Sequence, residues 1–347
     1  MRAVKKTRSS GNNGVVTLQQ VAERVGLTKG TVSAVLNDSP AAKAIPKGTK
    51  DRVLAAAQDL NYRPNFFARS LRNKRTYTIG VITEEIGDPY GAMVISGIEA
   101  FLSARKYFFL TVVHRHNPAM LQQYEGVLLA RGVEGFITVD TSLTQPPPLP
   151  TVAVAGHRRM AGVTNIVLDH VQAVWDVLKH LVGLGHRSIA FMRGQAFSSD
   201  SADRWRAICG ACSDLGISMQ SELTVQLNED DPSPNLGYRA TRELLSRKRP
   251  FTALFAYNDI SAIGAIRAIR ESGLGVPQDV SVVGFDDIRE AAYHLPSLTT
   301  VRQPLRSMGE IAAQTLVERI EGQKKYPSQI AVKPELVVRE STAQAVS

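Results

Sequence analysis

Cysteine and long apolar runs are both scarce in this sequence. Its 347 residues include two cysteines, Cys209 and Cys212, which are too few for the disulfide framework of a small secreted domain. No stretch reaches the roughly 18 consecutive apolar residues of a transmembrane helix, and no apolar segment follows the basic first residues as it would in a secretory signal. We therefore expect a soluble, cytoplasmic protein with no membrane partner.

Motifs for catalysis and metal binding are also missing. The sequence contains no full G-x-G-x-x-G, P-loop or G-x-S-x-G motif. Cys209 and Cys212 fall inside a predicted helix without the second pair that a zinc site needs, and His114 and His116 have no nearby carboxylate in the sequence. We expect no enzyme activity, no cofactor and no metal site.

Acidic residues are rare in the first part of the chain. Residues 1–75 contain 15 Lys and Arg against 4 Asp and Glu, a net charge of +11, whereas the remainder has 26 against 28, a net charge of −2. A compact basic module on a nearly neutral body is typical of nucleic-acid binding. The alternative is a solvated face with a disordered basic tail.

The basic module is predicted to contain a helix-turn-helix. Thr17 and Gln20 match a capping box at the start of a first helix, which ends at Gly26. Thr28 is expected to cap a second helix in "GLTKGTVSAVLN". Two short helices across a glycine-containing turn form the motif.

From Tyr77 onward, short β-branched strands alternate with amphipathic helices. Two successive series of this kind predict two parallel-sheet subdomains. Ligands of such sheets bind beyond the carboxyl ends of the strands, so the crevice between the subdomains is the expected pocket.

Several stretches occur in an order typical of one known family. They are "TLQQVAERVGLTKGTVSAVLN", "RVLAAAQDLNYRPNFFARSLR", "IGVI", "LVGLGHRSIAF", "YNDISAIGAIRAIRESGLGVPQDVSVVGFDD" and "LTTVRQPLRSMGEIAAQTLVERI". Together they resemble the LacI/GalR family of bacterial transcription regulators. The resemblance implies an all-α helix-turn-helix headpiece joined by a hinge helix to an α/β core of two parallel-sheet subdomains, similar to periplasmic binding proteins.

The resemblance also implies domain boundaries. They are a disordered basic arm (1–14), a helix-turn-helix DNA-binding domain (15–63), a hinge helix and linker (64–76), and an effector-binding and dimerisation domain (77–347) with an N-subdomain (77–163 plus 294–325) and a C-subdomain (164–293 plus 326–347).

DNA contacts are implied for the second helix and the hinge. The expected major-groove residues are Thr17, Thr28, Lys29, Gly30, Thr31, Ser33, Ala34 and Asn37. The expected minor-groove and hinge residues are Asn65, Ala68, Arg69, Leu71 and Arg72, with Leu71 as the side chain that wedges a base step. Lys29 is the long side chain of the reading face, and we expect it to contact guanine O6 and N7.

A small-molecule site is implied in the body. The residues that match the family's effector contacts are Tyr90, His157, Arg204, Asn258 and Asp286. Many sugar-binding members have an aspartate where this sequence has Gly156, which is followed by His157, Arg158 and Arg159. We hypothesise an anionic effector, a sugar acid or sugar phosphate. The alternative is that the arginines face solvent.

The expected function is a sequence-specific, nucleoid-associated transcription regulator. We expect a repressor of carbohydrate-utilisation genes that binds a pseudo-palindromic double-stranded operator as a homodimer, under the control of a sugar or sugar derivative. The open alternatives are a sugar-binding protein without a DNA role, and a corepressor-dependent or activating regulator.

Overall fold

The computed structural model describes residues 16–63, 70, 74–156, 159–229, 231–322 and 325–346. The chain divides into two units, Met1–Thr76 and Tyr77–Ser347, which we call the headpiece and the body. The expected arm (1–14), the expected hinge residues Asn65, Ala68, Arg69, Leu71 and Arg72, and His157 lie outside the described residues.

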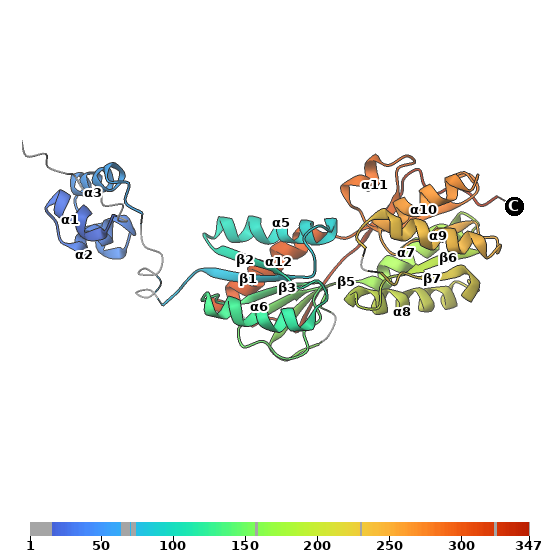
Figure 1. Cartoon of the computed structure of the whole chain (residues 1–347), viewed down its shortest axis with the longest axis horizontal. Coiled ribbons are helices and arrows are strands. Elements are labelled where there is room, and N and C mark those ends of the chain that lie inside the picture. Colours follow the sequence, from blue (N-terminus) through green and yellow to red (C-terminus); the bar gives the residue numbers. More distant parts are fainter. Residues whose placement is uncertain are drawn as a thin grey trace, which may run out of the picture. The chain divides into compact units, whose positions relative to one another are not determined.

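The headpiece contains the expected helix pair and a third helix. Its elements are α1 (Leu18–Val25), α2 (Lys29–Leu36), the 3-10 helix η1 (Pro40–Ala44) and α3 (Lys47–Asp59) (Figure 1). The capping box is confirmed, because Thr17 Oγ1 accepts from Gln20 N while Thr17 N donates to Gln20 Oε1 at 2.7 Å. Thr28 caps α2, since its Oγ1 accepts from Thr31 N at 3.1 Å.

Small side chains fill the core of the headpiece. Val21, Val32 and Val53, one from each helix, have no exposed surface, and Ala22, Val25, Val35, Ala56 and Ala57 complete the cluster. Arg52 of α3 donates to Val25 O at 2.8 Å, which ties the third helix to the end of α1. This packing holds the start of α2 in a fixed orientation within the headpiece.

The body begins with a six-stranded parallel sheet in the order β11-β5-β4-β3-β1-β2. Its strands are β1 (Thr78–Thr83), β2 (Phe108–Val113), β3 (Phe136–Val139), β4 (Thr151–Val154), β5 (Val163–Leu168) and β11 (Gln329–Val332). The helices α5 (Pro89–Ala104) and α12 (Leu305–Ile320) cover one face, and α6 (Pro118–Ala130) covers the other. This sheet with its helices is the first lobe.

The second lobe is built on the sheet β12-β10-β9-β8-β6-β7. Its strands are β6 (Ile189–Arg193), β7 (Thr224–Gln226), β8 (Ala253–Phe255), β9 (Ser281–Asp286), β10 (Thr299–Arg302) and β12 (Glu335–Val337), and β12 is antiparallel to β10. The helices α7 (His170–Gly183) and α8 (Ser199–Asp214) pack on one face, and α9 (Pro234–Ser246) and α10 (Asp259–Glu271) on the other.

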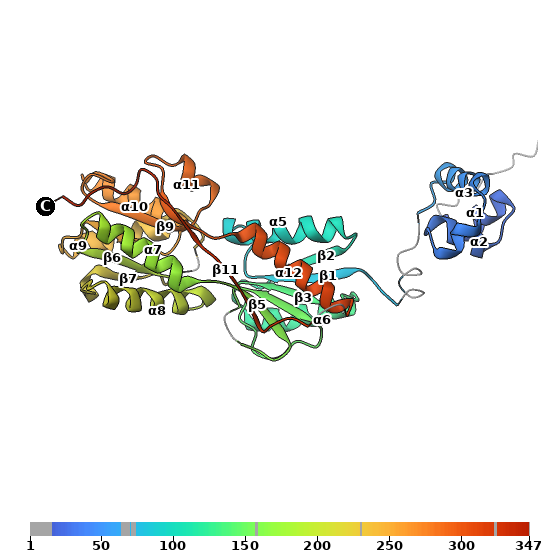
Figure 2. The same cartoon turned by 180° about the vertical axis from the view of Figure 1, so that it is seen from behind.

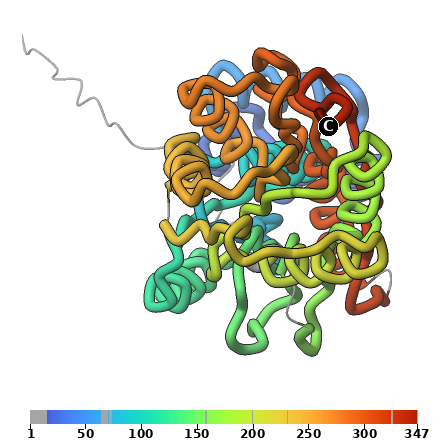
Figure 3. Tube along the Cα trace, turned by 90° about the vertical axis from the view of Figure 1, so that its right-hand side faces the viewer, coloured from blue at the N-terminus to red at the C-terminus, as the bar shows by residue number. Residues whose placement is uncertain are grey.

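Short elements and the chain end complete the second lobe. The 3-10 helix η2 (Ser221–Leu223) precedes β7, and α11 (Arg289–Tyr293) follows β9. Figure 3 shows the red C-terminal segment beside this lobe, where Ala345 N donates to Leu184 O at 2.8 Å. Among the described residues, we find no helix with the length and apolar character needed to span a membrane.

The strand pairing corrects the expected subdomain boundaries. Residues 164–168 and 329–332 were expected in the C-subdomain, but β5 and β11 belong to the first sheet. Residues 299–302 were expected in the N-subdomain, but β10 belongs to the second sheet. The reason is that a strand's own residues do not specify which sheet completes its hydrogen bonding. The chain therefore crosses between the lobes after β5, after β10 and after β11.

Two glycines allow α5 and α12 to pack with their backbones in contact. A Cβ on Gly97 of α5 would overlap the carbonyl of Arg306, and one on Gly309 of α12 would overlap the carbonyl of Val94. Figure 2 shows the two helices lying side by side. Any larger residue at either glycine would push α5 and α12, the first and last helices of the first lobe, apart.

Candidate functional site

The start of α2 is the exposed part of the expected reading helix. Thr17, Thr28, Lys29, Gly30 and Asn37 are exposed, and Thr31 is half-buried. The helix carries no acidic residue in its first turn, and the positive end of a helix dipole favours the phosphates of DNA. This end of α2 is therefore the surface suited to nucleic acid.

Ser33 and Ala34 are not on that surface. They were expected in the major groove, but they are 8% and 9% exposed, because α2 packs against α1, α3 and η1 and buries four consecutive positions, Val32–Val35. The Asn37 side chain folds back over this turn, where Nδ2 donates to Ser33 O at 2.7 Å. Fewer side chains than expected can therefore contact a base directly.

A cavity of about 120 Å³ lies between the two lobes of the body. Its walls come from segments that follow β1, β3, β6, β7, β8 and β9 at their carboxyl ends, which is where ligands of parallel sheets bind. One water needs about a tenth of this volume, so the cavity fits a small organic molecule. Tyr90, Arg204, Asn258 and Asp286, expected to contact an effector, all line it.

Arg204 is held firmly in the cavity wall. It is 3% exposed, and its Nη1 donates to Tyr257 O at 2.5 Å while its Nη2 lies 3.4 Å from Asp200 Oδ2. Its guanidinium carbon lies 3.6 Å from the ring centroid of Phe285. Asp200 also lies 3.3 Å from His170 Nε2. This network orients the guanidinium before any ligand arrives.

Asn258 also has a structural role. Its Oδ1 accepts from Ser261 N at 2.9 Å, and its backbone N donates to Ser261 Oγ at 3.1 Å, so that it caps α10. The capping uses the side-chain oxygen. The amide NH2 is then the part of Asn258 suited to donate to a ligand.

Asp286 ends β9 in a strained conformation. Its φ is +116°, a region that costs a non-glycine residue about 1–3 kcal/mol and is found mostly at functional sites. Its Oδ1 accepts from Gln303 Nε2 at 2.6 Å. Burial raises the pKa of Asp286 well above its usual value, while the charge of Arg204 acts in the opposite direction.

The Tyr90 hydroxyl is buried and has no hydrogen-bond partner among the described residues. Burial raises its pKa well above the usual value, and the nearby charges of Asp200, Asp140 and Asp286 raise it further. A buried hydroxyl without a partner is costly. A ligand in the cavity would supply one.

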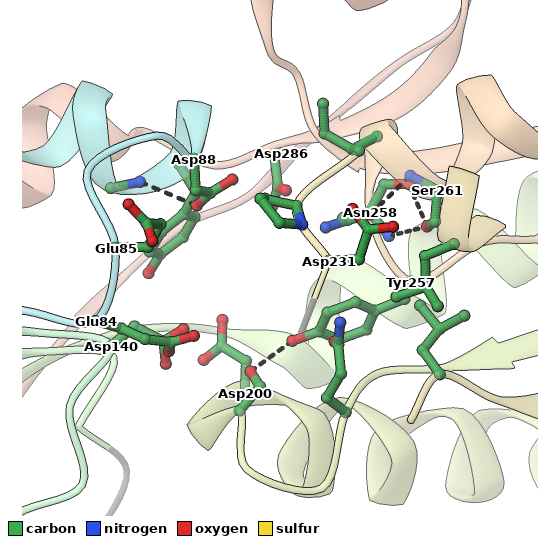
Figure 4. Close-up of a pocket in the computed structure, with 18 of the residues that line it drawn as sticks. Glu84, Glu85, Asp88, Asp140, Asp200, Asp231, Tyr257, Asn258, Ser261 and Asp286 are labelled. Atoms are coloured by element: carbon green, nitrogen blue, oxygen red, sulfur yellow. Dashed lines mark hydrogen bonds between the residues drawn. The ribbon is translucent and has the colours of Figure 1, made fainter. Parts of the chain in front are cut away.

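Carboxyl groups dominate the described lining. It contains one arginine, Arg204, and seven acidic side chains, namely Glu84, Glu85, Asp88, Asp140, Asp200, Asp231 and Asp286. Figure 4 shows labelled carboxyl groups from both lobes around the same space. Of these acids, only Asp286 was predicted from the sequence. The others also stand in segments that follow strands, and this position is the feature that could have identified them.

The described part of the lining gives no support to the anionic effector expected from Gly156 and its neighbours. Gly156 is buried, and a Cβ there would lie 2.6 Å from Asn165 Oδ1, so the glycine is required by packing. Arg159 is exposed, with its Nη2 3.5 Å from Gln329 Oε1. Arg159 therefore faces solvent, which is the alternative that the sequence left open.

Comparison with known proteins identifies both parts of the chain. Residues 17–65 match the model "Bacterial regulatory proteins, lacI family", and residues 178–342 match "Periplasmic binding protein-like domain". The chain is 32% identical over 338 residues to the HTH-type transcriptional repressor PurR of Erwinia tasmaniensis, covering 95% of this chain and 97% of that protein. The PurR repressor of Yersinia enterocolitica is 31% identical with the same coverage.

Solved structures agree with this assignment. A lac repressor dimer bound to operator and the anti-inducer ONPF has a TM-score of 0.84 at 28% identity, covering 95% of this chain and 100% of that one. A complex of the transcriptional regulator CelR with cellobiose has a TM-score of 0.67 at 29% identity, covering 94% and 99%. A regulator from Enterococcus faecium with bound ribose has a TM-score of 0.68 at 26% identity, covering 78% and 100%.

Proposed function

The chain belongs to the lacI family of bacterial regulatory proteins, and from this premise we propose that it is a sequence-specific DNA-binding repressor controlled by a small molecule. The observation that carries the proposal is the presence in one chain of a capped helix-turn-helix with an exposed basic start and a cavity lined by two lobes. The first feature suits DNA and the second suits an effector.

The DNA partner is a pseudo-palindromic operator bound by a homodimer. A two-fold protein places two recognition helices in successive major grooves, and the related lac repressor binds its operator as a dimer. In this chain Thr28, Lys29 and Gly30 are the exposed start of the recognition helix. We assign the minor-groove contact to the hinge, with Leu71 as the inserted side chain. We propose that the protein acts at the nucleoid, in the cytoplasm.

The effector acts by changing the population of the DNA-competent state. The cavity is lined by residues from both lobes, so a ligand that binds one closure angle more tightly shifts the equilibrium toward it. Polar side chains that line the cavity can bind the hydroxyl groups of a carbohydrate. The cellobiose and ribose complexes of related regulators support a sugar or sugar derivative, and hence control of carbohydrate-utilisation genes.

The proposal is tested by selecting fragments of the protein's own genome that the full-length chain binds, and then titrating salt. Because phosphate contacts release counterions, affinity for the selected site should fall by orders of magnitude between low and moderate salt. Lys29→Ala should weaken binding, whereas Lys179→Ala on the exposed surface of α7 should not. No salt-sensitive DNA binding by the full chain would refute the proposal.

A further inference from the structure

Two carboxyl groups, one half-buried and one buried, face the effector cavity from opposite lobes. Asp88 precedes α5 of the first lobe and Asp286 ends β9 of the second, and both line the cavity. They are close enough that the charge of Asp88 raises the pKa of Asp286. Figure 4 shows them as neighbours across the space. The cavity thus brings two carboxyl groups together across the cleft that closure must narrow.

Among the described lining residues, Arg204 is the one arginine or lysine near this pair. Asp88 Oδ2 accepts from Gly91 N at 3.2 Å, and its charged neighbour is Glu85. Asp286 has Arg204 and Asp259 as its other charged neighbours, and Arg204 is already 3.4 Å from the carboxylate of Asp200. Burial raises the pKa of both Asp88 and Asp286. Both groups therefore favour the protonated form, and a positive charge bound between them would replace those protons.

Aromatic side chains also line this cavity. Tyr90, Phe197 and Tyr257 all line the cavity, and the faces of such rings attract cations. The buried Tyr90 hydroxyl, which lacks a partner among the described residues, can accept a hydrogen bond from an N–H donor. It is an independent sign of a missing ligand group at this place.

We infer that the effector carries a positively charged nitrogen, as an amino sugar or another small hydroxylated amine does, and that its ammonium group binds between Asp88 and Asp286. This inference rests on the proposed function. A metal ion is a poorer candidate for the charge, because the described residues contain no group of three or more His, Cys, Asp and Glu side chains placed to hold one.

The inference also assigns a physical cause to the response. A cation between Asp88 and Asp286 displaces their protons and is attracted by both carboxylates, so it stabilises the closed arrangement of the lobes. A neutral sugar could bind to the walls but would leave both groups protonated and would gain no such attraction. The charge of the ligand is then the feature that couples binding to closure.

Matched pairs of probes test this. The full-length protein is titrated with glucosamine and glucose, and with ethanolamine and ethylene glycol, and thermal stabilisation and binding heats are measured. Because the amine makes charge-assisted hydrogen bonds that its alcohol cannot make, each amine should bind at least roughly tenfold more tightly than its alcohol. Its affinity should rise from acidic to neutral pH, with protons released on binding.

Variants locate the effect. Asp88→Asn and Asp286→Asn should each remove most of the preference for the amine, and asparagine tolerates the positive φ of Asp286. Glu243→Gln, an exposed acid of α9, should leave the preference unchanged. Equal binding of amine and alcohol, or stabilisation by neither, overturns the inference. Operator binding is measured in parallel, and its loss would count against the proposed function instead.

Discussion

The ring of His116 lies against the ring of Phe197, with their centroids 3.8 Å apart. His116 follows β2 of the first lobe and Phe197 follows β6 of the second, so the contact joins the lobes directly. His116 is also paired with Glu84 of the cavity wall. Phe197 lines both the effector cavity and a neighbouring cavity of about 500 Å³. We therefore expect closure of the lobes to depend on the packing of this aromatic pair.

Removal of the pair should alter the response to the effector. We expect Phe197→Ala to lose about 0.5–1.5 kcal/mol of contact between the lobes and to change the effector concentration needed to shift operator binding. Tyr293→Ala, at a position that is 86% exposed, serves as the control. The two variants are compared by effector titration of operator binding. An unchanged midpoint for Phe197→Ala would show that the pair does not influence closure.

Lys29 should read one base pair in each half-site. Because its exposed side chain stands at the start of α2, Lys29→Ala should lose about 1–3 kcal/mol of discrimination at that base pair. The measurement is binding to an operator series in which each position is substituted in turn. A uniform loss of affinity across the series would mean that Lys29 contacts only phosphate.

A side chain at Gly30 should stabilise the headpiece but weaken its binding to DNA. A Cβ there would have only Thr28 Oγ1 nearby, at 3.7 Å, so Gly30→Ala should stabilise the headpiece by up to about 1 kcal/mol. Gly48→Ala in α3, also in open space, should stabilise it similarly. If the α2 backbone approaches the bases, only Gly30→Ala weakens operator binding. Equal operator affinity for both variants would contradict that close approach.

Asp259 should make the body less stable as the pH rises. Burial raises the pKa of Asp259 to about 7, above its value in the unfolded chain of about 4. The folded state then binds more protons, so the free energy of unfolding falls between about pH 4 and pH 7, by an amount on the order of a few kcal/mol.

Asparagine at this position isolates the effect. Asp259 accepts from Thr300 Oγ1 at 2.5 Å and from Ile288 N at 2.9 Å, and an amide can bond both groups without charge. Denaturant unfolding at pH 5 and pH 8 should show a smaller pH dependence for Asp259→Asn than for Asp214→Asn, an exposed position. The same slope in both variants would disprove the assignment.

The contact between α5 and α12 should tolerate no side chain at Gly309. Because a Cβ there would overlap the backbone of α5, Gly309→Ala should destabilise the body by about 1–3 kcal/mol or more. Gly210→Ala in α8, with nothing within 4 Å, should instead stabilise it by up to about 1 kcal/mol. Thermal unfolding of the two variants checks the opposite signs.

Local features of the fold could be predicted from the sequence. The capping box of Thr17 and Gln20 and the cap at Thr28 depend on residues within one turn, and both are present. The cavity also followed from a local rule, because Asn258 and Asp286 stand at strand ends.

Features that depend on distant contacts could not be predicted. The sheet to which β5, β10 and β11 belong is decided by partners far along the chain. Packing against neighbouring elements buries Ser33 and Ala34. The anionic hypothesis used a basic stretch near Gly156, whereas the charge of the cavity is assembled from loops of both lobes.

The crossings between the lobes have a consequence for synthesis of the protein. The first lobe opens with β1 at residue 78, but its sheet is completed only by β11 at residues 329–332 and its face only by α12 at residues 305–320. The headpiece ends by residue 76, and domains generally fold as units while the chain emerges. A ribosome making this protein therefore exposes a finished DNA-binding unit long before the lobe that helps to form the effector cavity can close.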